Sequence, residues 1–392
     1  MTLTEKFQRI EAEMNDKFME RHDPIHGLIV SLLAKKHLLV LGPPGTAKSW
    51  MVREITSRIQ DCQYFEYLLT RFTTPEELFG PFSLKALEDD RYYRITNGRL
   101  PRAHLAFIDE IYKGSSAIAN TMLALINERI FHNNNVAESV PLQTMIGASN
   151  ELPSESEELA AFHDRFLLKY EVKYIMEPSS FLRMLDGAPA LAENTKITLD
   201  ELKEAQDQVK QVKISKEVNE LMQKIRFELA KQGIIPSDRV FMTSLELIRA
   251  EAWLMGLAET IPETMGICQH AYWDTPKAAR DVKMTVLRAS SKEMLEIEQA
   301  YEEAQMLIKP KTKLDEDLTE VKQSLEDRKK LAKVIKTLQD HIPMLEKKKL
   351  PVFKYQSMLI AARFRLQQLD STLTGNELED VLAANKAKKA QK

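Results

Sequence analysis

The chain has 392 residues, of which 44% are apolar and 29% charged, a composition typical of folded globular domains and not of disordered segments. Its 55 basic and 58 acidic side chains give a formal net charge of −3, which argues against a dedicated nucleic-acid coat. The two cysteines, Cys62 and Cys268, are too few and too far apart to predict a disulfide framework or a zinc site.

No apolar run approaches the ~18 residues that a membrane-spanning helix needs. The N-terminal residues Met1–Lys6 lack the apolar core of a signal peptide. Together with the sparse cysteines, these features predict a cytoplasmic protein without a membrane span. The length is enough for roughly two or three domains.

The first 36 residues carry apolar side chains at helical spacing, and Asp23-Pro24 predicts a turn before a second helix over 25–34. The apolar run His37–Leu41 then ends in Gly42-Pro43-Pro44-Gly45, and a helical pattern follows over 47–59. An apolar run that stops at a Gly/Pro turn before a helical pattern is typical of a strand, a loop and a helix. We predict these three elements in that order.

Several further apolar runs of strand length follow along the chain. The predicted strands cover residues 64–69, 105–108, 145–148 and 167–172. They alternate with helical stretches such as 116–129, and this alternation indicates parallel βαβ units. Residues 82–95 are the exception, because they predict a β-hairpin that turns at Asp89-Asp90.

The chain changes character after about residue 176. Residues 199–256 follow a helical pattern, and beyond residue 276 the sequence is rich in Lys, Glu, Leu and Gln. Two sets of apolar residues each step by four, three and four: Leu314, Leu318, Val321 and Leu325, then Leu331, Ile335, Leu338 and Ile342. The phase shift between them predicts long packed helices with an irregular seam. Pro343 and Pro351 predict a turn, and residues 385–392 form a basic tail.

Residues 42–49 read Gly-Pro-Pro-Gly-Thr-Ala-Lys-Ser, which is close to the phosphate-binding pattern G-x-x-x-x-G-K-[ST]. Such a loop presents backbone N–H groups and a helix N-terminus to the phosphates, with a Lys for the β- and γ-phosphates and a hydroxyl for Mg²⁺. Ala47 replaces the second glycine, and since it enters the helix we expect a negative φ there. The strand before the loop and the helix after it disfavour a chance match. We predict that these residues bind ATP: Gly42, Pro43, Pro44, Gly45, Thr46, Ala47, Lys48 and Ser49.

The predicted strand over 105–108 is followed directly by two acids, Asp109 and Glu110. The carboxyl ends of strands are where open α/β sheets place their ligands. An aspartate there is suited to hold Mg²⁺ beside Ser49, and the adjacent glutamate is suited to polarise a water toward the γ-phosphate. A strand that merely ends in surface acids is the alternative, and the phosphate loop makes it the weaker one.

With two further motifs, these segments resemble an AAA+ ATPase of the MoxR family, closest to its RavA branch. The further motifs are Ile146–Asn150 and Asp164-Arg165-Phe166, supported by Phe72–Pro81, Asn127–Arg129, Ala148–Pro153 and Ser237–Arg239. The resemblance covers about residues 15–275. It implies an α/β fold whose αβα core has a parallel sheet and a β-hairpin insert in the second helix, near 82–95. We expect the core over 1–175, a helical lid over 176–275 and a helical, coiled-coil-like appendage over 276–392.

The resemblance also implies roles for individual residues. Asn150 corresponds to the sensor that orients the attacking water, on a strand between the two that carry the nucleotide motifs. Arg165 corresponds to the arginine finger that reaches a neighbouring subunit's γ-phosphate, and Arg239 to the second sensor in the lid. Residues predicted to pack against the adenine are Arg21, His22 and Ile25.

Simpler interpretations stay open for these residues. Asn150 is also suited to a turn, and Arg165 to a surface ion pair with Glu151 or Asp164. Arg239 is suited to pair with Asp238 or to cap backbone carbonyls. Arg21 and His22 could form an ordinary polar pair before a proline. Arg129 is a second candidate for the arginine that acts in trans.

The function that the resemblance implies is ATP hydrolysis in a homo-oligomeric ring, expected to be hexameric, that remodels or activates a protein client. It also implies a partner with a von Willebrand factor A domain. The alternative is a nucleotide-gated scaffold or switch with slow hydrolysis. A nucleic-acid motor is disfavoured by the net charge and by the lack of interleaved basic and aromatic residues. Unlike RavA-type proteins, residues 277–392 show no cluster of short strands, and we expect them to contact a partner or to brace the lid.

Overall fold

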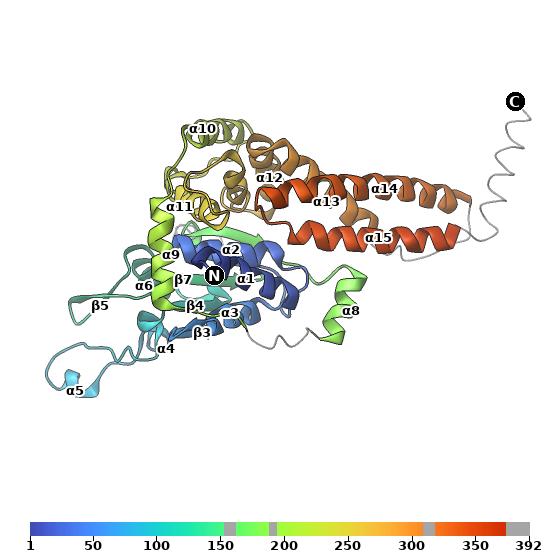
Figure 1. The fold of residues 1–392 in the computed structure, drawn as a ribbon. Coiled ribbons are helices and arrows are strands. Elements are labelled where there is room, and N and C mark those ends of the chain that lie inside the picture. Colours follow the sequence, from blue (N-terminus) through green and yellow to red (C-terminus); the bar gives the residue numbers. More distant parts are fainter. Residues whose placement is uncertain (153–161, 188–193, 309–317, 374–392) are drawn as a thin grey trace, which may run out of the picture. The chain divides into compact units, whose positions relative to one another are not determined.

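The computed structural model describes residues 1–152, 162–187, 194–308 and 318–373 (Figure 1). The chain forms two compact units. The first combines Met1–Tyr174 with Ala188–Ser291, and the second combines Ile175–Gly187 with Lys292–Lys392. No helix in the described ranges combines the length and the hydropathy that crossing a membrane requires.

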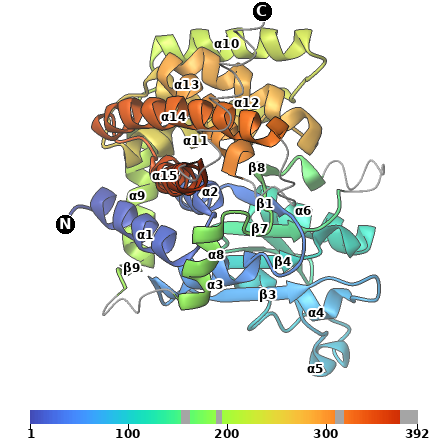
Figure 2. The ribbon, with the colours of Figure 1, turned by 90° about the vertical axis from the view of Figure 1, so that its right-hand side faces the viewer.

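A five-stranded parallel sheet forms the centre of the first unit, with the strand order β3-β4-β7-β1-β8 (Figure 2). Its strands are β1 (His37–Leu41), β3 (Tyr64–Leu68), β4 (Leu105–Asp109), β7 (Thr144–Ser149) and β8 (Phe166–Glu171). All five of the predicted strands are therefore confirmed, and so is the parallel α/β class. Because β7 lies between β4 and β1, the carboxyl ends of these three strands are neighbours.

Helices pack against this sheet because each presents apolar residues to it. The helices in contact with the strands include α2 (His22–Ala34) and α3 (Lys48–Ser57). On other parts of the core lie α1 (Leu3–Lys17), α4 (Pro75–Phe79) and α6 (Ser116–Glu128). The turn predicted at Asp23-Pro24 is wrong, since both residues belong to the first turn of α2. Proline is tolerated there because the first N–H groups of a helix have no partner within the helix.

The segment 82–95, predicted to be a hairpin, forms only the base of one. An antiparallel bridge joins Phe82 to Arg94, and the Ser83 N–H donates to the Tyr93 carbonyl. Between them the chain forms the short helix α5 (Leu84–Leu87), because the Ser83 side chain caps its first turn. A regular hairpin follows α6 instead, in β5 (Ile130–Asn133) and β6 (Val136–Ser139), at a place where we predicted no strands.

The rest of the first unit is helical apart from β9 (Ile197–Thr198), which pairs with β2 (Ile59–Gln60). Its helices are α9 (Leu199–Gln211), α10 (Lys216–Lys231), α11 (Asp238–Leu254), η3 (Pro262–His270) and α12 (Pro276–Ser290). The predicted appendage began at residue 276, but α12 packs against α10 and η3. The compact unit therefore ends after Ser291.

The second unit contains α8 (Pro178–Asp186) and three mutually packed helices, α13 (Lys292–Ile308), α14 (Leu318–Lys347) and α15 (Phe353–Leu373). The second set of the predicted seam is confirmed, since Leu331, Ile335, Leu338 and Ile342 are all buried. Leu325 of the first set is half-buried. Leu314 and the tail 385–392 lie outside the described residues. The turn that Pro343 and Pro351 predict lies between Lys347 and Phe353, beside Pro351. Pro343 itself does not end α14, which continues to Lys347 with Ile342 and Leu345 buried.

A buried histidine ties the N-terminal helices to α11. His26 Nδ1 lies 2.9 Å from Glu11 Oε1, and His26 Nε2 lies 2.8 Å from Glu251 Oε2. Burial alone would lower the pKa of His26, but Glu251 and Glu11 outweigh it and raise that pKa well above 6.5. A raised pKa in the folded state means that His26 stabilises the fold fully below pH 6.5 and loses this contribution as the pH rises through the folded-state pKa.

Replacing His26 with glutamine should therefore destabilise the protein in a pH-dependent way. We expect the free energy of unfolding to fall by about 3 kcal/mol at pH 6, because two buried carboxylates lose their cation. The loss should shrink at higher pH, where the native histidine is neutral. Urea unfolding between pH 6 and 10 measures this, with the exposed His132→Gln as the control. A loss that is the same at every pH would refute the pairing.

Candidate nucleotide site

The loop over residues 42–47 connects the end of β1 to the start of α3, as predicted. Gly42 lies so close to β8 that a Cβ atom on it would come within 2.2 Å of the Val172 carbonyl oxygen. Its N–H donates to the Ser149 carbonyl at the end of β7, over 2.9 Å. Gly45 has a φ of +76°, which glycine adopts without steric cost. The two glycines thus fix the loop between β1, β7 and β8.

Ala47 departs from our expectation. Its φ is +65°, in the left-handed region, where it precedes the first residue of α3. The negative φ predicted from its position is therefore wrong, because the turn into the helix needs the conformation that glycine supplies in the standard pattern. An alanine in this region costs roughly 1–2 kcal/mol through contact of its Cβ with the backbone.

Replacing Ala47 with glycine should relieve this strain. We expect the free energy of unfolding to rise by about 1 kcal/mol, the lower end of that cost, because glycine also makes the unfolded chain more flexible. Ala124, inside α6, is the matched control, since Ala124→Gly should lower the free energy of unfolding by about 1 kcal/mol. Urea unfolding compares the two, and a destabilised Ala47→Gly variant would contradict the assigned backbone conformation.

Lys48 begins α3 and folds back over the loop. Its Nζ donates to the carbonyl oxygens of Gly42 and Pro43, both at 2.9 Å. Burial lowers the pKa of the Lys48 ammonium, and the negative charges of Asp109 and Glu110 oppose that shift. The ammonium is therefore held among oxygen acceptors above a helix N-terminus, where the oxygens of a bound phosphate can take the place of the carbonyls.

Asp109 is the last residue of β4, and Glu110 follows it with a φ of +51°. The Glu110 N–H donates to Asp109 Oδ1 over 3.0 Å, and Glu110 Oε2 lies 3.3 Å from Lys113 Nζ. A non-glycine residue held at positive φ stores strain, and such residues cluster at functional sites. The Ser49 hydroxyl and the Asp109 carboxylate are oxygen donors of the kind that Mg²⁺ prefers, so the residues present fit that ion.

Asn150 follows β7 and is exposed. The register aligns Gly147 of β7 with Ile108 of β4, and Ala148 with Val40 of β1. Asn150 therefore leaves the sheet between the strand of Asp109 and the strand of the phosphate loop. The turn after it is stabilised by the Ser149 hydroxyl, which donates to the Glu151 carbonyl and accepts from the Glu151 N–H.

Two arginines share the carboxylate of Asp164. Arg165 Nη1 lies 3.1 Å from Asp164 Oδ2, and Arg239 Nη1 lies 3.6 Å from the same oxygen. The Arg165 side chain is 18% exposed and that of Arg239 is 56% exposed. Of the simpler interpretations, the pairing of Arg165 with Asp164 is present, whereas Asp238 pairs with Arg226 and not with Arg239. The Asp164-Arg165-Phe166 segment and helix α11 therefore interact through the carboxylate of Asp164.

Arg129 has a different environment. Its guanidinium donates to the carbonyls of Lys35, Ile126 and Gln143, and it lies 2.9 Å from the ring of His37. Burial lowers its pKa to about 10, and burial and Arg129 together hold the pKa of His37 well below its usual value. Arg129 thus joins the ends of α2 and α6 to the strand region, and both terminal nitrogens of its guanidinium are engaged within its own subunit.

The three residues predicted to pack against adenine have different surroundings. Arg21 is buried, and its guanidinium donates to the carbonyls of Thr46 and Lys173. Ile25 is fully buried in the core. His22 is partly buried, and its Nδ1 lies 2.9 Å from Asn15 Oδ1. In this arrangement Arg21 braces the phosphate loop, and contact of these residues with a base stays a prediction.

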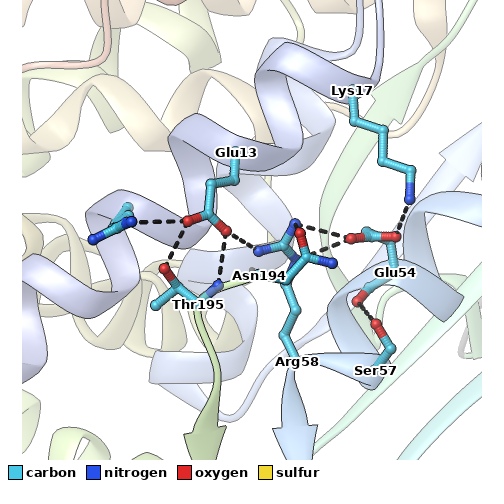
Figure 3. Close-up of polar contacts among 8 residues, drawn as sticks. Glu13, Lys17, Glu54, Ser57, Arg58, Asn194 and Thr195 are labelled. Atoms are coloured by element: carbon cyan, nitrogen blue, oxygen red, sulfur yellow. Dashed lines mark hydrogen bonds and ion pairs between the residues drawn. The ribbon is translucent and has the colours of Figure 1, made fainter. Parts of the chain in front are cut away.

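The far end of α3 is held by a cluster of buried charges that we did not predict (Figure 3). Arg58 is fully buried and pairs with Glu54 of α3 and Glu13 of α1. Burial alone would raise the pKa of Glu13, but Thr195 and Arg58 lower it below its usual value. Lys17 binds the second oxygen of Glu54. The helix that starts at the phosphate loop is thereby anchored to α1 and to the segment before β9.

The family description that matches residues 5–214 is that of the MoxR domain in MoxR-vWA-beta-propeller ternary systems. This match spans more than half of the chain. The chain belongs to the MoxR family of AAA+ ATPases. An AAA lid domain matches residues 217–286, a range that includes most of α12 and agrees with its place in the first unit.

Relatives of this MoxR protein are found in archaea. An uncharacterized protein of Methanocaldococcus jannaschii is 40% identical over 285 residues, which cover 72% of this chain and 76% of the relative. A second uncharacterized protein of that organism is 42% identical over 270 residues, 69% of this chain and 70% of the relative. The match to a structural protein of Acidianus two-tailed virus is weaker, 26% over 182 residues, 45% of this chain and 29% of that protein.

The fold of this MoxR protein also resembles a solved structure. The crystal structure of an inferred ATPase of Cytophaga hutchinsonii superposes with a TM-score of 0.58 and covers 74% of this chain and 95% of that one. The two sequences are only 17% identical, so this likeness supports the fold alone.

Proposed function

We propose that this MoxR protein binds Mg²⁺ and ATP at the carboxyl ends of β1, β7 and β4 and hydrolyses the ATP. The observation that carries the proposal is the strand order, which brings the phosphate loop, Asn150 and Asp109-Glu110 to neighbouring strand ends. Each group on its own has a simpler interpretation. A phosphate loop beside two strand-end acids is the arrangement that phosphoryl transfer to water requires.

Each side chain then has a separate task. Lys48 exchanges the loop carbonyls for β- and γ-phosphate oxygens, and the loop N–H groups from Gly45 to Ser49 hold the phosphate chain. Ser49 and Asp109 would hold Mg²⁺, which neutralises phosphate charge when it is bound. Glu110 accepts a proton from the attacking water, and Asn150 orients that water. The buried position of the Glu110 oxygen suits it to this role.

We further propose that Arg165 acts in trans and that Arg129 does not. Three backbone carbonyls already accept from the Arg129 guanidinium, whereas Asp164 is the one side-chain partner of the Arg165 guanidinium among the described residues. An arginine that completes a neighbour's site needs an assembly of several copies, for which a hexameric ring is our proposal. Arg239 would contact the phosphates of its own subunit from the lid.

The ring would act on a protein client together with a partner that carries a von Willebrand factor A domain, in the cytoplasm. Support comes from the matching family, which is described from systems that combine MoxR with vWA and beta-propeller proteins. We propose the second unit as the surface that contacts this partner. Closeness to the RavA branch stays a prediction, since the matched family description does not name that branch. If a purified vWA partner changes neither ATP turnover nor client state, the slow nucleotide-gated scaffold becomes the better proposal.

Lys48→Ala tests the nucleotide site. Removing the ammonium should weaken ATP binding by at least about 100-fold, because a hydrogen-bonded charge pair with phosphate is worth roughly 3 kcal/mol. ATP concentrations near the native dissociation constant should therefore leave the variant essentially without bound ATP. Isothermal titration calorimetry with a non-hydrolysable ATP analogue and Mg²⁺ measures the dissociation constant. The matched control is Lys224→Ala on the exposed face of α10, which should bind as the native protein does. Native affinity in the Lys48→Ala variant would remove the phosphate loop from the proposal.

A further inference from the structure

A tyrosine and a histidine that no motif includes join the two catalytic segments. Tyr112 lies two residues after Glu110, in the short helix η2 (Ile111–Lys113), and His163 directly precedes Asp164. The Tyr112 hydroxyl lies 2.6 Å from His163 Nδ1, and the two rings lie 5.9 Å apart. This contact spans 51 residues of sequence and connects the strand end of β4 to the segment that carries Arg165.

The protonation of the pair follows from its burial. Burial is the main cause that lowers the pKa of His163, to about 4, and the nearby Lys169 ammonium lowers it further. Burial also raises the pKa of Tyr112. At neutral pH the histidine is therefore uncharged and the tyrosine keeps its proton. The pair is then a neutral hydrogen bond, in which the Tyr112 O–H donates to His163 Nδ1 when the ring carries its proton on Nε2.

The Tyr112 side of the pair belongs to the turn that carries Glu110, the proposed general base. Glu110 is the strained residue at φ +51°, and its carbonyl accepts from the Lys113 N–H over 2.8 Å. Tyr112 lies within this turn. A displacement of Glu110 toward a bound nucleotide would therefore move the Tyr112 side chain as well, because one short turn holds both residues.

The His163 side of the pair belongs to the segment that carries Arg165, the proposed arginine finger. His163 is 5% exposed and is followed by Asp164 and Arg165. Arg165 is held weakly: its Nη1 contacts Asp164 over 3.1 Å, and its Nε is buried without a hydrogen-bond partner in the described part of the chain. An arginine with so few contacts of its own depends on the backbone that precedes it for its position.

We infer that Tyr112 and His163 are positioning residues that set the direction in which Arg165 leaves its subunit, and that they link it to the Glu110 turn of the same subunit. The inference rests on the proposed trans role of Arg165. Since the role inferred for both residues is to place Arg165, their loss should act on the neighbour's site. It should lower turnover there without changing ATP binding.

Mixed rings separate this effect from any effect on the variant's own site. Arg165→Ala subunits keep a native ATP site but offer no arginine, and Lys48→Ala subunits offer Arg165 but bind no ATP. Their mixture should hydrolyse ATP only where Lys48→Ala subunits complete Arg165→Ala sites. We place Tyr112→Phe in the Lys48→Ala subunit. The control is Tyr64→Phe in that subunit, which removes a hydroxyl bound to Glu66 on the sheet edge.

We expect Tyr112→Phe to lower the turnover of the mixture by about tenfold or more relative to Tyr64→Phe, with KM unchanged, since small misplacements of catalytic groups cost up to ~100-fold. Native mass spectrometry confirms equal mixing. Turnover equal to that of the control would overturn the inference and leave the trans role of Arg165 intact. If no mixture has any turnover, including the one with native Tyr112, the trans role itself fails and the inference falls with it.

Two substitutions of His163 test the hydrogen bond itself. His163→Asn keeps an acceptor oxygen close to the position of Nδ1, whereas His163→Leu fills the space without one. In the Lys48→Ala subunit, the asparagine should retain most of the turnover of the mixture and the leucine should lose about tenfold. Equal loss in both variants would mean that His163 only fills space, and would overturn the inference.

Discussion

Replacing Arg165 with alanine should leave ATP binding unchanged and lower kcat by about 10³-fold. An arginine supplied across a subunit interface stabilises the charge that develops on the transferred phosphoryl group, and in other phosphoryl-transfer enzymes this is worth ~10³-fold or more. Within the described part of this chain the guanidinium contacts the carboxylate of Asp164, which it can exchange for a neighbour's phosphate. Calorimetric ATP titration and steady-state phosphate release measure the two quantities separately.

The control for this variant is Arg288→Ala, on the exposed face of α12, which should hydrolyse ATP at the native rate. Addition of Lys48→Ala subunits should restore part of the turnover of Arg165→Ala. At some interfaces the intact ATP site of an Arg165→Ala subunit then receives the native Arg165 of a Lys48→Ala subunit. Mixed rings without any recovered turnover would place Arg165 in its own site, or make Arg129 the arginine in trans despite its backbone contacts.

Replacing Glu110 with glutamine should keep ATP bound and lower kcat by about 10²-fold or more, the typical contribution of a positioned general base. Glutamine has nearly the same shape, so the strained turn and its contact with Asp109 persist while the proton acceptor is lost. Phosphate release at saturating ATP gives kcat, and filter binding of labelled ATP shows that the nucleotide is retained. The exposed Glu204→Gln on α9 is the matched control. Native turnover by Glu110→Gln would refute the role of this residue.

The strands and the nucleotide loop could be predicted because each has a local cause. The run His37–Leu41 is buried along its whole length, and such a run stopped by Gly42-Pro43 fits only a central strand before a loop. Asp109 and Glu110 end a strand of the same kind. The alternation of strands and helices then implied a parallel sheet, and the resemblance of the motifs to those of AAA+ ATPases implied that β7 lies between the two motif strands.

The errors arose where contacts from distant parts of the chain decide the conformation. Ala47 takes a positive φ because the loop it ends is fixed by β7 and β8, which follow more than 90 residues later in the sequence. Pro343 does not end α14, because Ile342 and Leu345 are buried in the helix packing of the second unit. Local propensity gives no sign of either effect.

The same reason explains the site residues that were missed. Arg58 looks like an ordinary surface cation at the end of α3, and only the fold brings Glu13 and Asn194 to it. Tyr112 and His163 are 51 residues apart and belong to no pattern, so spacing could not pair them. We did not predict that Arg21 also braces the loop, which it does because the Lys173 carbonyl, far along the chain, lies within reach of its guanidinium.

We propose that the groups at the ends of β1, β7 and β4 make one ATP-hydrolysing site. Steady-state phosphate release by the purified full-length chain, with ATP and Mg²⁺, tests it most directly when the native protein is compared with Lys48→Ala and Glu110→Gln. We expect the native protein to turn over ATP and the Lys48→Ala variant to show no turnover above background, because ATP is not bound there. The turnover of Glu110→Gln should be about 10²-fold lower than that of the native protein, with ATP still bound. Turnover that persists at the native level in both variants would contradict it.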